Sequence, residues 1–193
     1  QNTDPFPIKI KEVTMLDIAT AYNKYKFLGN EFLTWIWYLI ETGENISDLL
    51  GVKEDISLEI GNSIVLENRL GDKSKERITI KGDQAGLEEG STALQKGAVV
   101  TQINLGLKLG QEQEDAYRFT IKGESFGLTG LKTPSTGKAS SEDEMEGLIL
   151  EKAYLVSELT RVIDTLFLKF MEKRISEEWK TEELKKIRDW IIS

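Results

Sequence analysis

The sequence predicts an α+β fold: an antiparallel sheet with helices packed on one face and a long C-terminal helix. Apolar residues recur at helical spacing near both ends of the chain and alternate with polar residues in its middle. The links between the alternating segments are short enough for hairpins, which favours antiparallel pairing. The chain of 193 residues is 39% hydrophobic, so it can bury a core, and we expect one domain over 1–193.

Two helices are expected first. Helical spacing of apolar residues predicts one over 14–26. The segment 28–30 interrupts the pattern, and Asn30 is expected to cap a second helix over 31–42. This second helix is apolar almost all round, so it should lie centrally. Its aromatic residues Trp35 and Trp37 are therefore expected to pack in the core rather than to stack on bases.

The middle of the chain has the period of strands. Strands are expected over 56–60 and 64–68, joined by a hairpin turn at Gly61–Asn62. Further strands are expected over 75–81, 98–109 and 116–122, with a short helix over 84–96. The expected inward residues of these three strands are Ile78, Ile80, Val99, Thr101, Ile103, Leu105, Leu107, Leu109, Tyr117, Phe119 and Ile121.

A long loop and two helices complete the chain. Residues 123–141 are rich in Gly, Ser, Thr and Lys, which predicts a flexible surface loop, with 132–141 open to proteases. Ser141 and Glu144 form a capping-box pattern that opens a helix to about Arg174, and a last helix is expected over 181–192. The expected packing stripe of the long helix is Met145, Leu148, Ile149, Leu155, Val156, Leu159, Val162, Ile163, Leu166 and Phe170.

Composition restricts the chemistry. The chain has no Cys and no His, which excludes disulfides, thiol nucleophiles, zinc fingers and Ser-His-Asp triads. The Gly137–Lys138 pair lacks the earlier Gly and the following hydroxyl of a phosphate-binding loop. The acidic residues of 142–146 lie in a first helical turn, where carboxylates favourably meet the helix dipole. We expect no enzyme activity, cofactor or metal, and a cytoplasmic protein without a membrane span.

One face of the expected sheet is basic. Its outward positions include Lys75, Arg77, Lys81, Lys108, Arg118 and Lys122, accompanied by Thr79, Gln102, Asn104 and Thr120. None of these ten residues is acidic, although the chain carries a net charge of −8. A basic, hydrogen-bonding surface on an otherwise acidic protein is typical of phosphate-backbone binding, to DNA or RNA. Ordinary solvent-facing strand residues would have a similar composition, so that alternative stays open.

Several segments resemble the bacterial recombination-associated RdgC family. They are Glu31–Phe32–Leu33–Thr34–Trp35–Ile36, Lys96–Gly97–Ala98–Val99–Val100–Thr101–Gln102–Ile103–Asn104–Leu105 and Leu155–Val156–Ser157–Glu158–Leu159–Thr160–Arg161–Val162–Ile163. The similarity covers roughly 28–175 and corresponds to the C-terminal half of the family's usual chain. It implies a non-enzymatic, nucleoid-associated, dimeric protein that binds double-stranded DNA with little sequence preference and restrains recombination.

Two features depart from that family. From the extent of the resemblance we expect this chain to lack the family's N-terminal half, which argues against closure of that family's ring-like dimer. Its net charge of −8 gives less electrostatic attraction for DNA. The first hypothesis is an RdgC-like DNA-binding protein that uses the basic face. The alternative is a protein-interaction or self-association module that has lost DNA binding, with the long helix as a dimer seam.

Overall fold

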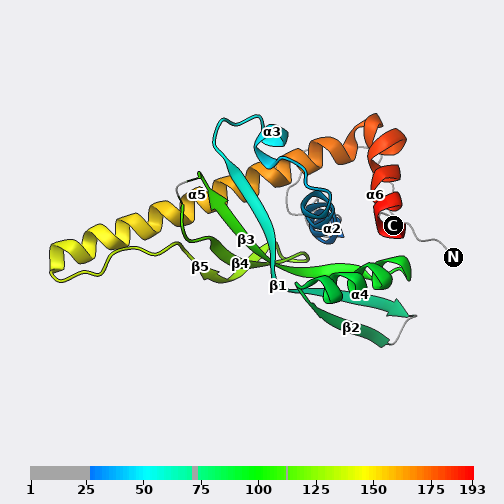
Figure 1. Ribbon diagram of the computed structural model, residues 1–193, viewed down its shortest axis with the longest axis horizontal. Helices are drawn as coiled ribbons and strands as arrows, with labels where there is room; N and C mark the ends of the chain where they lie inside the picture. The colour runs from blue at the N-terminus through cyan, green and yellow to red at the C-terminus, as the bar shows by residue number, and fades with distance from the viewer. Residues whose placement is uncertain (1–26, 71–73, 112) are drawn as a thin grey trace.

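The computed structural model describes residues 27–70, 74–111 and 113–193, and it has the expected α+β architecture (Figure 1). The helix expected over 14–26 lies outside the described residues. Along the chain the elements are α2 (Phe27–Glu41), α3 (Ile46–Leu50), β1 (Ile56–Leu70), β2 (Ser74–Lys81), α4 (Gln84–Gln95), β3 (Val99–Leu109), β4 (Tyr117–Lys122), β5 (Gly127–Lys132), α5 (Glu142–Ile175), a π-helical turn (Trp179–Glu183) and α6 (Leu184–Ile192).

The five strands form one antiparallel sheet in the order β2-β1-β3-β4-β5. The sheet's inner face carries the apolar residues, and the helices cover that face (Figure 1). Trp35 and Trp37 of α2 are fully buried there, which confirms the core-packing interpretation. Helix α4 lies on the same side, because a Cβ at Gly90 would come within 2.4 Å of Ile80 Cδ1 and 2.7 Å of Trp37 Cη2. The opposite, outer face is thereby left for solvent.

The helix boundary expected at Asn30 is wrong. Helix α2 runs through 28–30 without a break, and Thr34 Oγ1 donates to the Asn30 carbonyl at 3.1 Å. Gly29 has a different role, since a Cβ there would lie 1.7 Å from the Gly123 carbonyl oxygen. The glycine therefore allows the end of β4 to approach the helix.

The hairpin expected at Gly61–Asn62 is also wrong. Strand β1 continues through this dipeptide, and its register against β3 shifts between Ile60 and Ile64. The irregularity is a bulge held from the neighbouring strand: Asn62 N donates to Asn104 Oδ1 at 2.9 Å. A Cβ at Gly61 would meet the same oxygen at 2.0 Å, so glycine is needed where the strands approach closely.

Two more differences affect the sheet. A second register shift, beside Val65, places Val100 in the core and leaves Val99 partly exposed, the reverse of the expected order. Residues 127–132, expected to be loop, form the edge strand β5, which pairs with β4. The expected loop over 123–141 is therefore shorter. Residues 123–126 form a turn before β5, and residues 133–140, between β5 and α5, have no regular structure.

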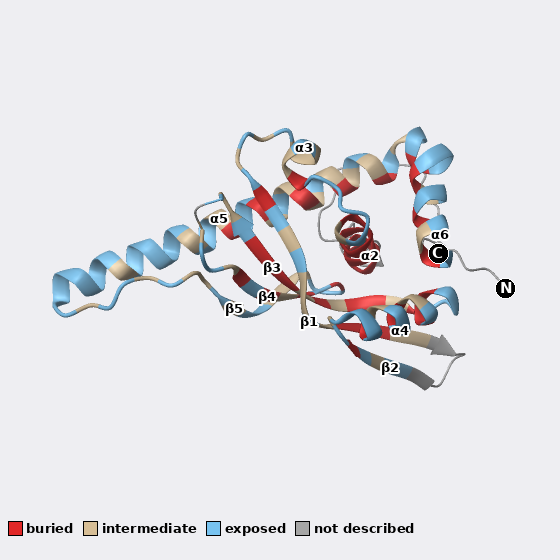
Figure 2. Cartoon of the chain, viewed as in Figure 1, coloured by how far each residue is buried: buried red, intermediate tan, exposed pale blue. Residues whose placement is uncertain are grey.

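The long helix α5 is capped as expected but is only half buried. Glu144 N donates to Ser141 Oγ at 3.3 Å, and the helix ends at Ile175. Its fully buried apolar residues begin at Leu159 and continue through Val162, Leu166 and Phe170, and the half-buried Leu155 packs against the same core. The expected stripe is therefore wrong at Met145, Ile149 and Val156, which are exposed. The first half of this helix projects beyond the sheet (Figure 1), and Figure 2 shows it mostly exposed.

The C-terminal end of α5 is anchored by a buried ion pair. Arg174 Nε donates to Glu31 Oε2 of α2 at 2.9 Å, and both side chains are 6% exposed. The Arg174 guanidinium lies over the Trp179 ring, 5.4 Å from its centroid. These contacts fasten α5 and the following turn to α2. Among the described residues, no helix is long and apolar enough to cross a membrane.

Candidate nucleic-acid interface

Five of the six predicted basic residues are exposed and lie on the outer face of the sheet. Arg77 and Lys81 come from β2, Lys108 from β3, and Arg118 and Lys122 from β4. The register confirms the shared face, because residues paired across antiparallel strands point to the same side. The sixth, Lys75, belongs to β2 opposite Arg69, but its side chain lies outside the described residues.

Strand β5 extends this face beyond the prediction. Lys132 is paired with Arg118 in the register and is exposed. Residues 127–132 are expected from the sequence to be loop, so Lys132 is not among the predicted basic residues of this face. Lys132 is assigned to this face by the backbone pairing of β5 with β4. The described outer face thus carries six cations: Arg77, Lys81, Lys108, Arg118, Lys122 and Lys132.

Strand β1 adds two carboxylates, Glu59 and Glu67, to the outer face, so this face is less basic than predicted. Glu59 Oε1 lies 2.6 Å from Arg118 Nη2, and both side chains are about half exposed. The pair crosses Gly106, where a Cβ would lie 2.4 Å from Arg118 Nη1. Glu67 is paired with Arg77 in the register. Two cations therefore face a carboxylate, and Lys81, Lys108, Lys122 and Lys132 have no ion pair within the described part of the chain.

Four of the six cations, two on β2 and two on β4, flank a strip of mostly polar side chains on β1 and β3. Strands lie about 4.8 Å apart, so β2 and β4, separated by β1 and β3, are about 14 Å apart. One row of the strip runs across the sheet from Thr79 through Val65 to Gln102 and then to Lys122. None of the described outer-face residues is aromatic.

Asn104 has a structural role within this strip. Its Nδ2 donates to the Phe119 carbonyl at 3.1 Å and to Thr120 Oγ1 at 3.0 Å, while its Oδ1 accepts from Asn62 N. The side chain thus ties β1 to β4 across β3. Both polar atoms of the Asn104 side chain are hydrogen-bonded within the sheet, so this residue stabilises the outer face.

A further carboxylate lies beside Lys108. Asp115, in the link from β3 to β4, accepts hydrogen bonds from the hydroxyl and the backbone N–H of Ser135. These bonds, followed by the charge of Lys108, hold the pKa of the Asp115 carboxyl below its usual range. The contact fastens the start of the 133–140 loop to the sheet.

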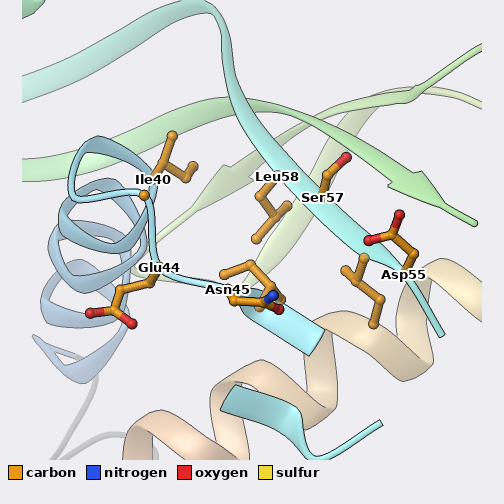
Figure 3. Close-up of a pocket in the computed structure, with 9 residues that line it drawn as sticks. Ile40, Glu44, Asn45, Asp55, Ser57 and Leu58 are labelled. Carbon is orange, nitrogen blue, oxygen red and sulfur yellow. The ribbon is translucent and has the colours of Figure 1, made fainter. Parts of the chain in front are cut away.

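The pocket drawn in Figure 3 was not anticipated from the sequence. It has a volume of about 280 Å³ and lies where α2 ends, α3 begins and β1 starts. Its two carboxylates, Glu44 and Asp55, stand on opposite sides of the pocket (Figure 3). They do not converge as the acid and base of an active site would. Within the described residues, no group of three or more carboxylates could hold a metal ion.

Within the described residues, the Gly137–Lys138 pair is not surrounded by backbone groups that could bind a phosphate. Both residues are exposed in the link between β5 and α5, and nothing lies within 4 Å of a Cβ placed at Gly137. A phosphate-binding loop surrounds its ligand with backbone N–H groups that open a helix. The surroundings of Gly137 therefore agree with an ordinary loop.

Comparison with known proteins adds no relative. No family model, curated protein or solved structure matches this chain.

Proposed function

We propose that the outer face of the sheet binds the phosphate backbone of double-stranded DNA. The observation that carries the proposal is the gathering of six exposed cations from four strands on one face that no described helix covers. The protein as a whole is acidic, with a net charge of −8, so this local excess of positive charge is not a consequence of composition. Lys and Arg side chains spread over a surface are the groups that neutralise phosphates.

Duplex DNA is favoured over single strands because the described outer face has no aromatic residue. Surfaces that bind single strands present aromatic rings on which bases stack. Here the residues between the cations include Ser63, Thr79, Gln102 and Thr120, which can donate hydrogen bonds to phosphate oxygens, together with the buried Val65 and the carboxylates Glu59 and Glu67. Contacts of this kind carry no base information, so binding would be largely independent of sequence.

The RdgC resemblance agrees with this proposal and suggests its biological setting. We propose an association with the nucleoid and a role in controlling recombination, without enzymatic activity. The long sheet face and the arrangement of its cations support the DNA-binding part of this role.

Charge reversal on the outer face tests the proposal. Lys81→Glu combined with Lys122→Glu removes one cation from each side of the polar strip, and neither residue has an ion pair with a described residue. We expect labelled duplex DNA to bind about tenfold or more weakly, because two phosphate contacts are lost and two repulsions gained. Exposed substitutions of this kind change the free energy of unfolding by only about 0.5 kcal/mol.

A matched control separates the face from the overall charge. Lys96→Glu with Lys185→Glu causes the same change in net charge on the helical side of the sheet, at the end of α4 and in α6. This control should retain most of the affinity for DNA. Equal loss of binding in the two double variants would refute an interface on the outer face.

A further inference from the structure

The projecting half of α5, which we call the arm (residues 142–158), has an apolar stripe that the described residues leave uncovered. Of the eight large apolar side chains that are exposed in the described part of the chain, five lie within 145–156. Met145, Ile149 and Val156 are 54%, 60% and 39% exposed. They are spaced by four and seven residues, so they share one face of the helix. We call these three residues the arm stripe.

The arm stripe leads into an apolar pocket at the root of the arm. The same spacing continues from Val156 to Ile163 and Phe167, which line a pocket of about 230 Å³ together with Phe126 and Leu128. A cavity of about 150 Å³ lined by such residues is large enough to bind benzene. The pocket can therefore receive one apolar or aromatic side chain from a partner that lies along the arm.

Phe126 is held in an unusual backbone conformation at this pocket. Its φ is 51°, and it is the one described non-glycine residue with a positive φ. Its ring packs edge-on against Phe167, with 4.6 Å between the ring centroids. Bulky residues rarely adopt positive φ, and they do so mainly at sites where the position of the side chain matters. This backbone conformation places the Phe126 ring in the lining of the pocket at the end of the arm stripe.

The charges of the arm identify the kind of partner. Within 142–158 the acidic residues are Glu142, Asp143, Glu144, Glu146, Glu151 and Glu158, and Lys152 is the one basic residue. Asp164 adds a carboxylate at the pocket. A second identical arm would bring carboxylates against carboxylates, and like charges in an interface are costly. Glu142 and Glu146 border one side of the stripe and Lys152 borders the other, while the arm as a whole is strongly negative. A partner with Lys or Arg beside its apolar residues would complement both the stripe and this net negative charge.

We propose that the arm and its root pocket bind an amphipathic helix of a partner protein, whose apolar face is bordered by Lys or Arg. An apolar residue of the partner fills the pocket beside Phe126, and its next turns lie on the arm stripe, as in other helix-in-groove complexes. The site is separate from the outer face of the sheet, so this inference does not depend on DNA binding.

The test uses the full chain and two synthetic helical peptides of about 18 residues, or five turns. Both have the same leucine face; one has lysine and the other glutamate at the bordering positions. Fluorescence anisotropy should show saturable one-to-one binding of the lysine peptide and none of the glutamate peptide. Ile149→Gln with Val156→Gln should weaken binding about tenfold or more, because central apolar anchors contribute most of the affinity of such interfaces.

The control variant is Leu168→Gln, which alters an equally exposed apolar residue of α5, 62% exposed, outside the arm. It should leave peptide binding unchanged, and DNA binding should be unchanged in both variants. Binding that is insensitive to Ile149→Gln with Val156→Gln would overturn the proposal, since charge attraction alone would then explain it. A concentration-dependent dimer that the same double variant converts to monomer would overturn it in favour of a second copy as the occupant.

Discussion

The ion pair between Glu59 and Arg118 determines how much of the outer face is available to an anion. The two side chains meet at 2.6 Å over the bare backbone of Gly106. A phosphate that approaches Arg118 must compete with this carboxylate. Because both groups are half exposed, the competition is weak, in the range of about 0.2–1 kcal/mol typical of surface pairs.

Glu59→Gln should therefore strengthen DNA binding. The substitution keeps the shape of the side chain, removes its negative charge and leaves Arg118 to a phosphate. We expect a gain of a few-fold in affinity, equivalent to the same free-energy range. The measurement is a titration of labelled duplex DNA with this variant and with a control, Glu172→Gln. The control removes the carboxylate partner of Lys169 on α5, a surface ion pair of the same kind. Affinity that does not rise above that of the Glu172→Gln variant would mean that Arg118 does not contact DNA.

At the scale of elements, the loop 133–140 is fastened at its two ends. Ser135 donates to Asp115, and the backbone N–H and hydroxyl of Ser140 donate to Glu144 Oε2, each at 2.6 Å. The residues between these contacts have no regular structure, and Lys138 is exposed. Such segments are the usual sites of proteolytic nicking.

Trypsin should consequently cut first after Lys138. Asp115→Ala removes one fastening and should speed this cleavage, whereas Glu114→Ala, which alters the adjacent exposed carboxylate, should not. Mass spectrometry of the first fragments identifies the site. A first cut inside β3, β4 or α5 would contradict the assignment of 133–140 as the most accessible segment.

Strands with regular alternation were predictable from the sequence. In β2 and β4 the inward residues Ile80, Tyr117, Phe119 and Ile121 are buried, as expected, and Ile78 is partly buried against the same core. The alternation of apolar and polar residues is a local property of the sequence. It is sufficient to predict a strand and its inward residues where the two faces of that strand differ strongly in polarity. For this reason five of the candidate basic residues were assigned to the correct face.

The elements that escaped prediction depend on distant parts of the chain. Gly61–Asn62 has the local signature of a turn, but Asn104, 42 residues from Asn62, holds it as a bulge. The segment 127–132 contains two glycines and becomes a strand because the edge of β4 offers it backbone partners. The arm follows the same rule, since periodicity predicts an apolar stripe in α5 but does not specify what covers it.

At the scale of the whole molecule, charge and apolar surface are separated. Six exposed cations lie on the described outer face of the sheet, while the arm carries five of the eight large apolar side chains that are exposed in the described part of the chain, together with six acidic residues. One chain thus offers two surfaces of opposite character, which suits a protein that binds DNA with one side and a protein partner with another. The central claim of this account is the first of these contacts.

The salt dependence of DNA binding tests that claim most directly. A labelled duplex is titrated with the full chain at about 50, 100 and 200 mM salt, a range in which counterion release strongly affects affinity. If Arg77, Lys81, Arg118 and Lys122 each neutralise one phosphate, the plot of log affinity against log salt should have a slope of about −3.6, at about −0.9 per contact. Duplexes of unrelated sequence should give the same slope. The absence of binding at the lowest salt, by a chain that circular dichroism shows to be folded, would contradict the account.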